Sequence, residues 1–198
     1  MKKLFTLALS ALMVLGAASC GSKVPEDPDH SFHAVGGWGV WEATEANKMT
    51  AITADESKQL GVDLTGKDVK YVYKYEVNIP AEDQSWTAKA LVDGAVKEFN
   101  GKYTIKCIIA HFDKEEETYA NDHWLPNPAD TDPGHVEALT SNLFFPTYQK
   151  EPDEHGFAWD QNPVLTDGGS KYTFIVAQYN AVSSATVVGY GFGAVKLA

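Results

Sequence analysis

The sequence predicts a mainly β fold: an antiparallel sheet or sandwich with one amphipathic helix. Runs of alternating apolar and polar residues recur along the chain, and Gly, Asn, Asp and Pro separate them. The 198 residues, of which 44% are hydrophobic, suffice for one buried core but are few for two. We therefore expect a single β-rich domain over residues 34–198.

The strongest strand is predicted over residues 69–79. Six apolar or aromatic residues at a spacing of two share one face of it: Val69, Tyr71, Tyr73, Tyr75, Val77 and Ile79. This alternation is typical of a strand with one buried face, and Pro80 ends it.

A helical pattern follows over residues 82–99. Its apolar positions fall on one helical face: Ala88, Leu91, Val92, Ala95 and Phe99. Asn100-Gly101 suits a left-handed helix end. A competing interpretation makes Asp93-Gly94 the turn of a β-hairpin. If the helix instead links adjacent parallel strands, an α+β mixed sheet results.

The remaining elements are mostly strands. Strong strands are predicted over 102–112, 171–179 and 185–197, shorter ones over 34–41 and 49–53, and a brief helix over 55–60 that Gly61 ends. Residues 113–169 are expected to form one long loop, with a short helix over 136–143. This loop is rich in Pro, Asp, Asn and His yet keeps aromatic residues, which is typical of a functional loop.

The N-terminus has the pattern of a secretory signal over residues 1–19. Met1-Lys2-Lys3 is basic, residues 4–14 are mostly apolar, and small residues lead to Cys20. The apolar stretch is shorter than the roughly 20 residues that a membrane-spanning helix needs. Ala17-Ala18-Ser19-Cys20 resembles the lipobox of bacterial lipoproteins, which implies a lipid, including palmitate, on Cys20. An ordinary signal peptide with an unmodified Cys20 is the alternative.

Residues 20–33 are expected to be a lipid anchor and a flexible tether. Residues 21–30 contain one apolar residue besides their prolines, so this stretch has little to bury. The resemblance places the protein in the bacterial cell envelope, at the outer membrane. Glu26-Asp27 is similar to the acidic export signals of surface-displayed lipoproteins, and the periplasmic and surface faces both stay open.

The charge excludes nucleic acid as a partner. All 16 basic residues are Lys, against 27 acidic residues, which gives a net charge of −11. Loss of residues 1–19 removes Lys2 and Lys3, so 14 Lys remain and the net charge becomes −13. Nucleic-acid binding needs a cationic surface, usually with Arg.

The sequence offers no catalytic or metal-binding motif. It has no Gly-x-Ser-x-Gly and no His-Glu-x-x-His, and Cys107 lies in an apolar alternation that predicts burial. Asp130-Thr131-Asp132 begins like a calcium loop, but Ser141 stands where the closing Glu belongs. We expect no catalytic residue, no metal and no cofactor. A carboxylate-dependent hydrolase remains an alternative, since 27 acids offer many pairs.

The five tryptophans suggest a binding function. We expect Trp38, Trp41 and Trp86 in the core, and Trp124 and Trp159 exposed on the long loop, where they would bind a ligand. Aromatic faces stack on the apolar faces of sugar rings, and this does not require a cationic surface.

The leading hypothesis is a lipid-anchored, non-enzymatic envelope protein that binds glycan through loop aromatics. In general plan it resembles the small outer-membrane lipoproteins that bind glycan. A structural or assembly lipoprotein that binds other envelope proteins is the second hypothesis, and its exposed aromatics would form a protein interface.

Overall fold

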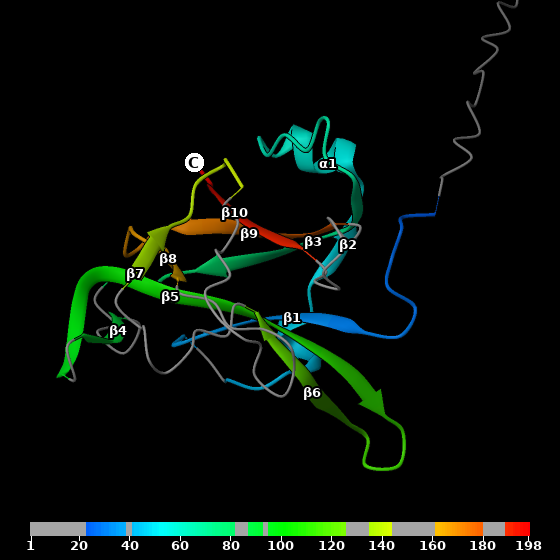
Figure 1. The fold of residues 1–198 in the computed structure, drawn as a ribbon, viewed down its shortest axis with the longest axis horizontal. Helices are drawn as coiled ribbons and strands as arrows, with labels where there is room; N and C mark the ends of the chain where they lie inside the picture. Colours follow the sequence, from blue (N-terminus) through cyan, green and yellow to red (C-terminus); the bar gives the residue numbers. More distant parts are fainter. Residues whose placement is uncertain are drawn as a thin grey trace, which may run out of the picture.

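The chain forms two β-sheets packed face to face, which confirms the predicted mainly β, sandwich-like fold (Figure 1). The computed structural model describes residues 23–38, 41–81, 87–92, 95–125, 135–143, 161–179 and 189–198. The predicted signal peptide, Cys20, Trp86, the calcium-like loop at Asp130 and Trp159 lie outside the described residues. No helix within these ranges is both long and apolar enough to cross a membrane.

The first sheet is built around one long strand, β5 (Ala95–Asp113). Its partners in this sheet are β1 (Ser31–Gly36), β4 (Thr87–Val92), β6 (Thr118–Leu125) and β8 (Gln161–Leu165), and β8 pairs in turn with β7 (His135–Ala138). The pairings of β5 are antiparallel, whereas β7 and β8 run parallel. The C-terminal half of β5 extends with β6 as a hairpin away from the second sheet (Figure 1).

The second sheet has the order β10-β9-β3-β2 among the described residues, and all its pairings are antiparallel. Its strands are β2 (Thr50–Ile52), β3 (Val69–Asn78), β9 (Lys171–Tyr179) and β10 (Tyr190–Lys196). The strands predicted over 69–79 and 171–179 are therefore confirmed. A bulge between Val69 and Tyr71 turns Val69 to the outer face, while Tyr73 and Val77 face the core as predicted.

The core between the sheets is rich in aromatic rings. Phe32 of β1 stacks on Tyr73 of β3 with ring centroids 4.0 Å apart and planes 14° apart. Phe174 stacks on Phe192 within the second sheet. Cys107 is fully buried here, its Sγ 3.8 Å from Sδ of Met49, and burial raises the pKa of its thiol. The predicted role of Cys107 as a small buried hydrophobe is confirmed.

The helix predicted over residues 82–99 is wrong where the structure describes this range. Residues 87–92 and 95–99 are strands, and Val92 pairs with Ala95, so the competing hairpin with a two-residue connection is confirmed. Gly101, expected to end the helix, has φ +72° at an irregularity where the partners of β4 jump from Phe99 to Tyr103. The glycine thus lets β5 continue through a bulge, because its missing Cβ permits a positive φ.

Among the described residues, the α-helix is α1 (Ala54–Gln59), which agrees with the brief helix predicted over 55–60. Thr53 and Glu56 form a capping box: Glu56 N–H donates to Thr53 Oγ1 at 3.1 Å, and Thr53 N–H donates to Glu56 Oε2 at 2.8 Å. Gly61 follows at φ +94°, as a helix end requires. The helix and the turn after it cover the outer face of the second sheet.

The expected long loop over residues 113–169 is also wrong where the structure describes it. Strand β6 begins at Thr118, after a four-residue turn, and strands β7 and β8 lie in the same stretch. The short helix predicted over 136–143 is replaced in part by β7, because its residues pair with β8. Strand β6 is set by its hairpin with β5, whereas β7 and β8 are set by pairing between segments far apart in the chain, which local patterns do not reveal.

The structure also differs from the flexible tether expected over residues 20–33. Residues 23–30, here called the strap, are mostly exposed but are bonded to the fold through Asp27. The Asp27 N–H donates to the hydroxyl of Tyr73 at 2.8 Å, and Asp27 Oδ1 accepts from the backbone N–H of Asp29 and His30 at 3.0 and 3.3 Å. The phenol of Tyr73, on a largely buried ring, thereby obtains a partner that holds the strap to the core.

We expect removal of one partly buried charge to stabilise the first sheet. Lys106 on β5 lies opposite Val35 of β1, and burial lowers the pKa of its ammonium from 10.5 to about 8. The unfolded chain therefore binds more protons between these pH values, and stability rises with pH across this interval. Lys106→Met should raise the free energy of unfolding at pH 7 by about 1–3 kcal/mol and flatten this rise.

Urea unfolding at pH 7 and pH 10 measures both effects. Lys97→Met, an exposed position on the same strand, serves as the control and should change neither value. Lower stability of Lys106→Met at pH 7, with Lys97→Met unchanged, would show that the ammonium of Lys106 contributes favourably.

Candidate functional site

The candidate site lies on the outer face of β1, β5 and β6, opposite the core. Here the described part of the chain exposes two large aromatic side chains, Trp41 at 43% and Phe112 at 49%. Trp124 and Tyr119 are half-buried beside them and pack on a small apolar cluster of Val35, Ala43, Ile108 and Ala110. We call Trp41, Trp124, Tyr119 and Phe112 the aromatic face.

A bulge in β6 brings the aromatic face together. Tyr119 and Trp124 are five residues apart, so a regular strand would turn them to opposite sides of the sheet. The pairing shifts between Ile109 and Ala110: Ile109 lies opposite His123, but Ala110 lies opposite Asn121. Because one extra residue enters β6, Tyr119 and Trp124 both pack on the outer cluster.

The extra residue in the bulge, Asp122, is held by His111. The Nδ1 atom of His111 lies 2.9 Å from both carboxylate oxygens of Asp122. The contact joins β5 to β6 at the irregular position.

Trp41 and Trp124 form the centre of one half of the aromatic face. Their ring centroids are 6.3 Å apart and their planes are inclined by 32°. Trp124, predicted as a ligand-binding residue on a long loop, thus lies on strand β6 with a second tryptophan next to it. Trp41 was expected in the core, which is wrong. Trp38 of the same Gly-Trp-Gly-Val-Trp segment packs against the core instead, over Gly36, where a Cβ would meet its ring at 1.7 Å.

The loop that carries Trp41 is fixed by a buried histidine. His33 on β1 is fully buried, and its Nδ1–H donates to the Thr44 carbonyl at 2.9 Å. Asn47 Oδ1 lies 3.1 Å from the same nitrogen, and Asn47 Nδ2 donates to the Glu42 carbonyl at 2.9 Å. These bonds hold residues 42–47, including the short 3-10 helix η1 (Glu45–Asn47), against β1. Burial is the main cause that lowers the pKa of His33.

Tyr119 and Phe112 form the other half of the aromatic face. The two rings meet edge to face with centroids 5.2 Å apart, and the Tyr119 hydroxyl donates to Glu45 Oε2 at 2.5 Å. Lys48 Nζ lies 5.8 Å from the Tyr119 ring centroid. The bond to Glu45 is the main cause that raises the pKa of the Tyr119 phenol.

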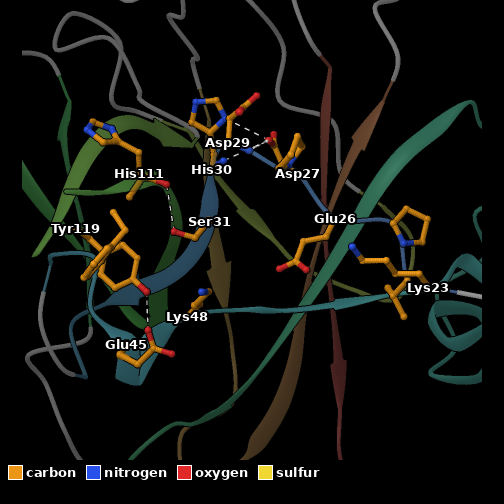
Figure 2. A pocket seen from close by; sticks show the side chains of 15 residues that line it. Lys23, Glu26, Asp27, Asp29, His30, Ser31, Glu45, Lys48, His111 and Tyr119 are labelled. Atoms are coloured by element: carbon orange, nitrogen blue, oxygen red, sulfur yellow. Dashed lines mark hydrogen bonds and ion pairs between the residues drawn. The ribbon is translucent and has the colours of Figure 1, made fainter. Parts of the chain in front are cut away.

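A cleft of about 790 Å³ opens beside Tyr119 and Phe112, between the first sheet and the strap (Figure 2). Its charged lining carries both signs, from Lys23, Glu26, Asp27, Asp29, Glu45 and Lys48. We call this hollow the strap cleft. In Figure 2, Glu26 extends from the strap toward Lys48, and Glu45 lies next to Tyr119 on the opposite wall. None of these lining residues except the acidic pair Glu26-Asp27 was singled out from the sequence.

Within the described ranges, no group of three or more His, Cys, Asp or Glu is arranged to hold a metal ion. No family model, no curated protein and no solved structure matches this chain. The site offers aromatic faces for stacking, with carboxylates, ammonium groups and a phenol beside them.

We expect the buried His33 to make the site sensitive to acid. The folded pKa of His33 lies below its ordinary 6.5, so the unfolded chain takes up its proton first and stability falls as pH drops below 6.5. His33→Gln should unfold with a smaller difference between pH 7 and pH 5 than the wild type. Thermal unfolding at the two pH values measures this. An unchanged difference in His33→Gln would contradict the expectation.

We expect Tyr73→Phe to release the strap without disturbing the core. The variant keeps the ring that stacks on Phe32 but loses the acceptor for the Asp27 N–H, a net cost of about 0.5–1.5 kcal/mol. Trypsin should then cut after Lys23 several-fold faster, as mass spectrometry would show. Tyr75→Phe, which removes a phenol bonded at 3.4 Å to the exposed Ala46 carbonyl, is the matched control. Equal cleavage rates in both variants would mean that Tyr73 does not hold the strap.

Proposed function

We propose that this chain is a lipid-anchored cell-envelope protein that binds glycan through the tryptophan pair of its aromatic face, Trp41 and Trp124, and performs no catalysis. The observation that carries the proposal is the pairing of Trp41 with Trp124 on the outer face of the first sheet. The lipid anchor rests on the lipobox-like segment that ends at Cys20. The outer membrane is the proposed location, and its periplasmic and surface faces are both open.

The two tryptophans offer what a sugar chain requires. A saccharide ring has an apolar face of C–H groups, which stacks on an indole, and a rim of hydroxyl groups, which needs donors and acceptors. Trp41 supplies an exposed indole. Its ring plane is inclined by 32° to that of Trp124, so the two indoles could stack on successive sugar rings of a curved chain. Because this binding needs no positive charge on the protein, it is compatible with a net charge of −11.

The strand origin of Trp124 favours a preformed site. Trp124 pairs through β6 with Ile108 of the central strand, and the loop of Trp41 is fixed through His33. Side chains held on such a scaffold lose little conformational entropy when a ligand binds. The second tryptophan of the sequence hypothesis, Trp159, lies outside the described residues, and its role in glycan binding stays a prediction.

The alternative of an assembly lipoprotein has one observation in its favour. Phe112 is 49% exposed near the end of the projecting β5–β6 hairpin, where it could enter a protein interface. A protein partner would bind through Phe112, whereas a glycan would bind through Trp41. Variants at these two positions therefore distinguish the two alternatives.

Affinity electrophoresis tests the proposal. The mature chain with Cys20→Ser migrates through native gels that contain single polysaccharides, with and without a chelator. We expect at least one polysaccharide to retard the chain, and Trp41→Ala or Trp124→Ala to weaken binding about tenfold or more. Phe112→Ala is the matched control and should migrate like the wild type. Because Trp41 is exposed, Trp41→Ala should change the thermal midpoint little.

Three outcomes would redirect the proposal. No retardation on any gel would reject glycan binding and make envelope proteins the partners to seek. Release of reducing ends from the polysaccharide would indicate a hydrolase that uses carboxylates. Retardation that a chelator abolishes would show that the calcium-like loop at Asp130 takes part.

A further inference from the structure

The strap cleft is lined by charged side chains, unlike the tryptophan pair, and one of its walls lies close in the chain to the proposed anchor at Cys20. One wall is the strap itself, residues 23–30, and the other wall comes from Glu45, Lys48 and the end of the β5–β6 hairpin (Figure 2). The same segment that closes the cleft leads directly to Cys20.

The strap limits how far the cleft can lie from the anchor. Only Gly21 and Ser22 separate Cys20 from Lys23, the first residue that lines the cleft, so their Cα atoms are at most about 11 Å apart in a fully extended chain. Further along, the Asp27 N–H is bonded to Tyr73, and Asp27 Oδ1 lies 3.4 Å from His30 Nδ1. A lipid on Cys20 would therefore hold the strap cleft next to the bilayer surface.

The lining selects against an anionic lipid headgroup. The charged lining consists of four carboxylates, those of Glu26, Asp27, Asp29 and Glu45, and two ammonium groups, those of Lys23 and Lys48, and the sum is −2 with neutral imidazoles. A phosphate or carboxylate with a net charge would be repelled by this lining. A neutral, hydroxyl-rich group suits it, because carboxylates accept from hydroxyl groups and Lys48 donates to them.

The size and the aromatic wall of the cleft suit a sugar. A volume of about 790 Å³ lies within the usual range of small-molecule sites, roughly 300–1,000 Å³. Phe112 and Tyr119 supply apolar surface on one side. The strap supplies polar groups, and the opposite wall places ring faces next to Glu45 and Lys48, so the cleft offers both the apolar surface and the hydrogen-bonding groups that a hexose needs.

We propose that the strap cleft binds the neutral sugar headgroup of a glycolipid in the membrane that anchors the chain. The inference rests on the lipid anchor of the proposed function and extends its glycan binding to a second site. The tryptophan pair would hold a polysaccharide, while the strap cleft would hold a headgroup presented by the bilayer.

Vesicle flotation tests this inference. The Cys20→Ser chain is mixed with phosphatidylcholine vesicles that carry diglucosyl diacylglycerol, and the fraction that floats is measured. Parallel samples use phosphatidylcholine alone and phosphatidylcholine with phosphatidylglycerol. We expect flotation only with the glycolipid. Glu26→Gln with Lys48→Met should lower the apparent affinity about tenfold or more, since hydrogen bonds to charged groups are lost.

Control variants separate the two sites. Trp41→Ala should float like the wild type, as should Glu76→Gln, whose carboxylate pairs with Lys171 on the second sheet. Thermal unfolding of the double variant checks that its fold is intact. The free glucose disaccharide of the headgroup should reduce flotation, because it would compete with the glycolipid for the cleft.

Each result decides between the two proposals. Retardation in polysaccharide gels without flotation would leave the proposed function standing and overturn the glycolipid site. Flotation without retardation would support the glycolipid site and reject the polysaccharide site at Trp41 and Trp124. Flotation with phosphatidylcholine alone, or with the double variant unchanged, would also overturn the glycolipid site.

Discussion

The backbone pairing of β5 is the constraint on which the rest of the structure depends. This 19-residue strand pairs with β4 and β8 along its first half and with β1 and β6 along its second half. Since side chains alternate between faces, its register decides at once which residues of four neighbours enter the core. Ile105, Cys107 and Ile109 face inward, and the outer cluster follows at Ile108 and Ala110.

Two irregularities in this pairing turn a regular sheet into a candidate site. At Gly101, a positive φ lets the strand pass from its β4 hairpin into the main sheet without ending. At Asp122, an extra residue moves Tyr119 to the face that Trp124 occupies. Bulges commonly re-aim side chains in this way. The aromatic face therefore results from small departures in register, and His111 stabilises one of them through Asp122.

The strap connects the core to the candidate binding surfaces. Tyr73 stacks on Phe32 between the sheets and, through its hydroxyl, holds Asp27 at the rim. His33, on the outer side of β1, holds the loop of Trp41 in a similar way through its bond to the Thr44 carbonyl. In both cases one side chain with a largely buried ring uses its polar atoms to fix a surface segment, which satisfies the polar group and shapes the site together.

The sequence by itself determined the alternating strands, the brief helix before Gly61, the burial of Cys107 and the mainly β class, because these follow from local periodicity and composition. It also identified Trp124 as a candidate, although on a loop. Only the tertiary structure decided that residues 87–99 are a hairpin, that the strap packs on Tyr73, and that Trp41 lies beside Trp124. The strap contact and the tryptophan pair join segments far apart in the chain, which local periodicity does not report. The hairpin is local, but the helical spacing of residues 88–99 and the Asp93-Gly94 turn signal predicted different structures, and only the pairing of β4 with β5 decided between them.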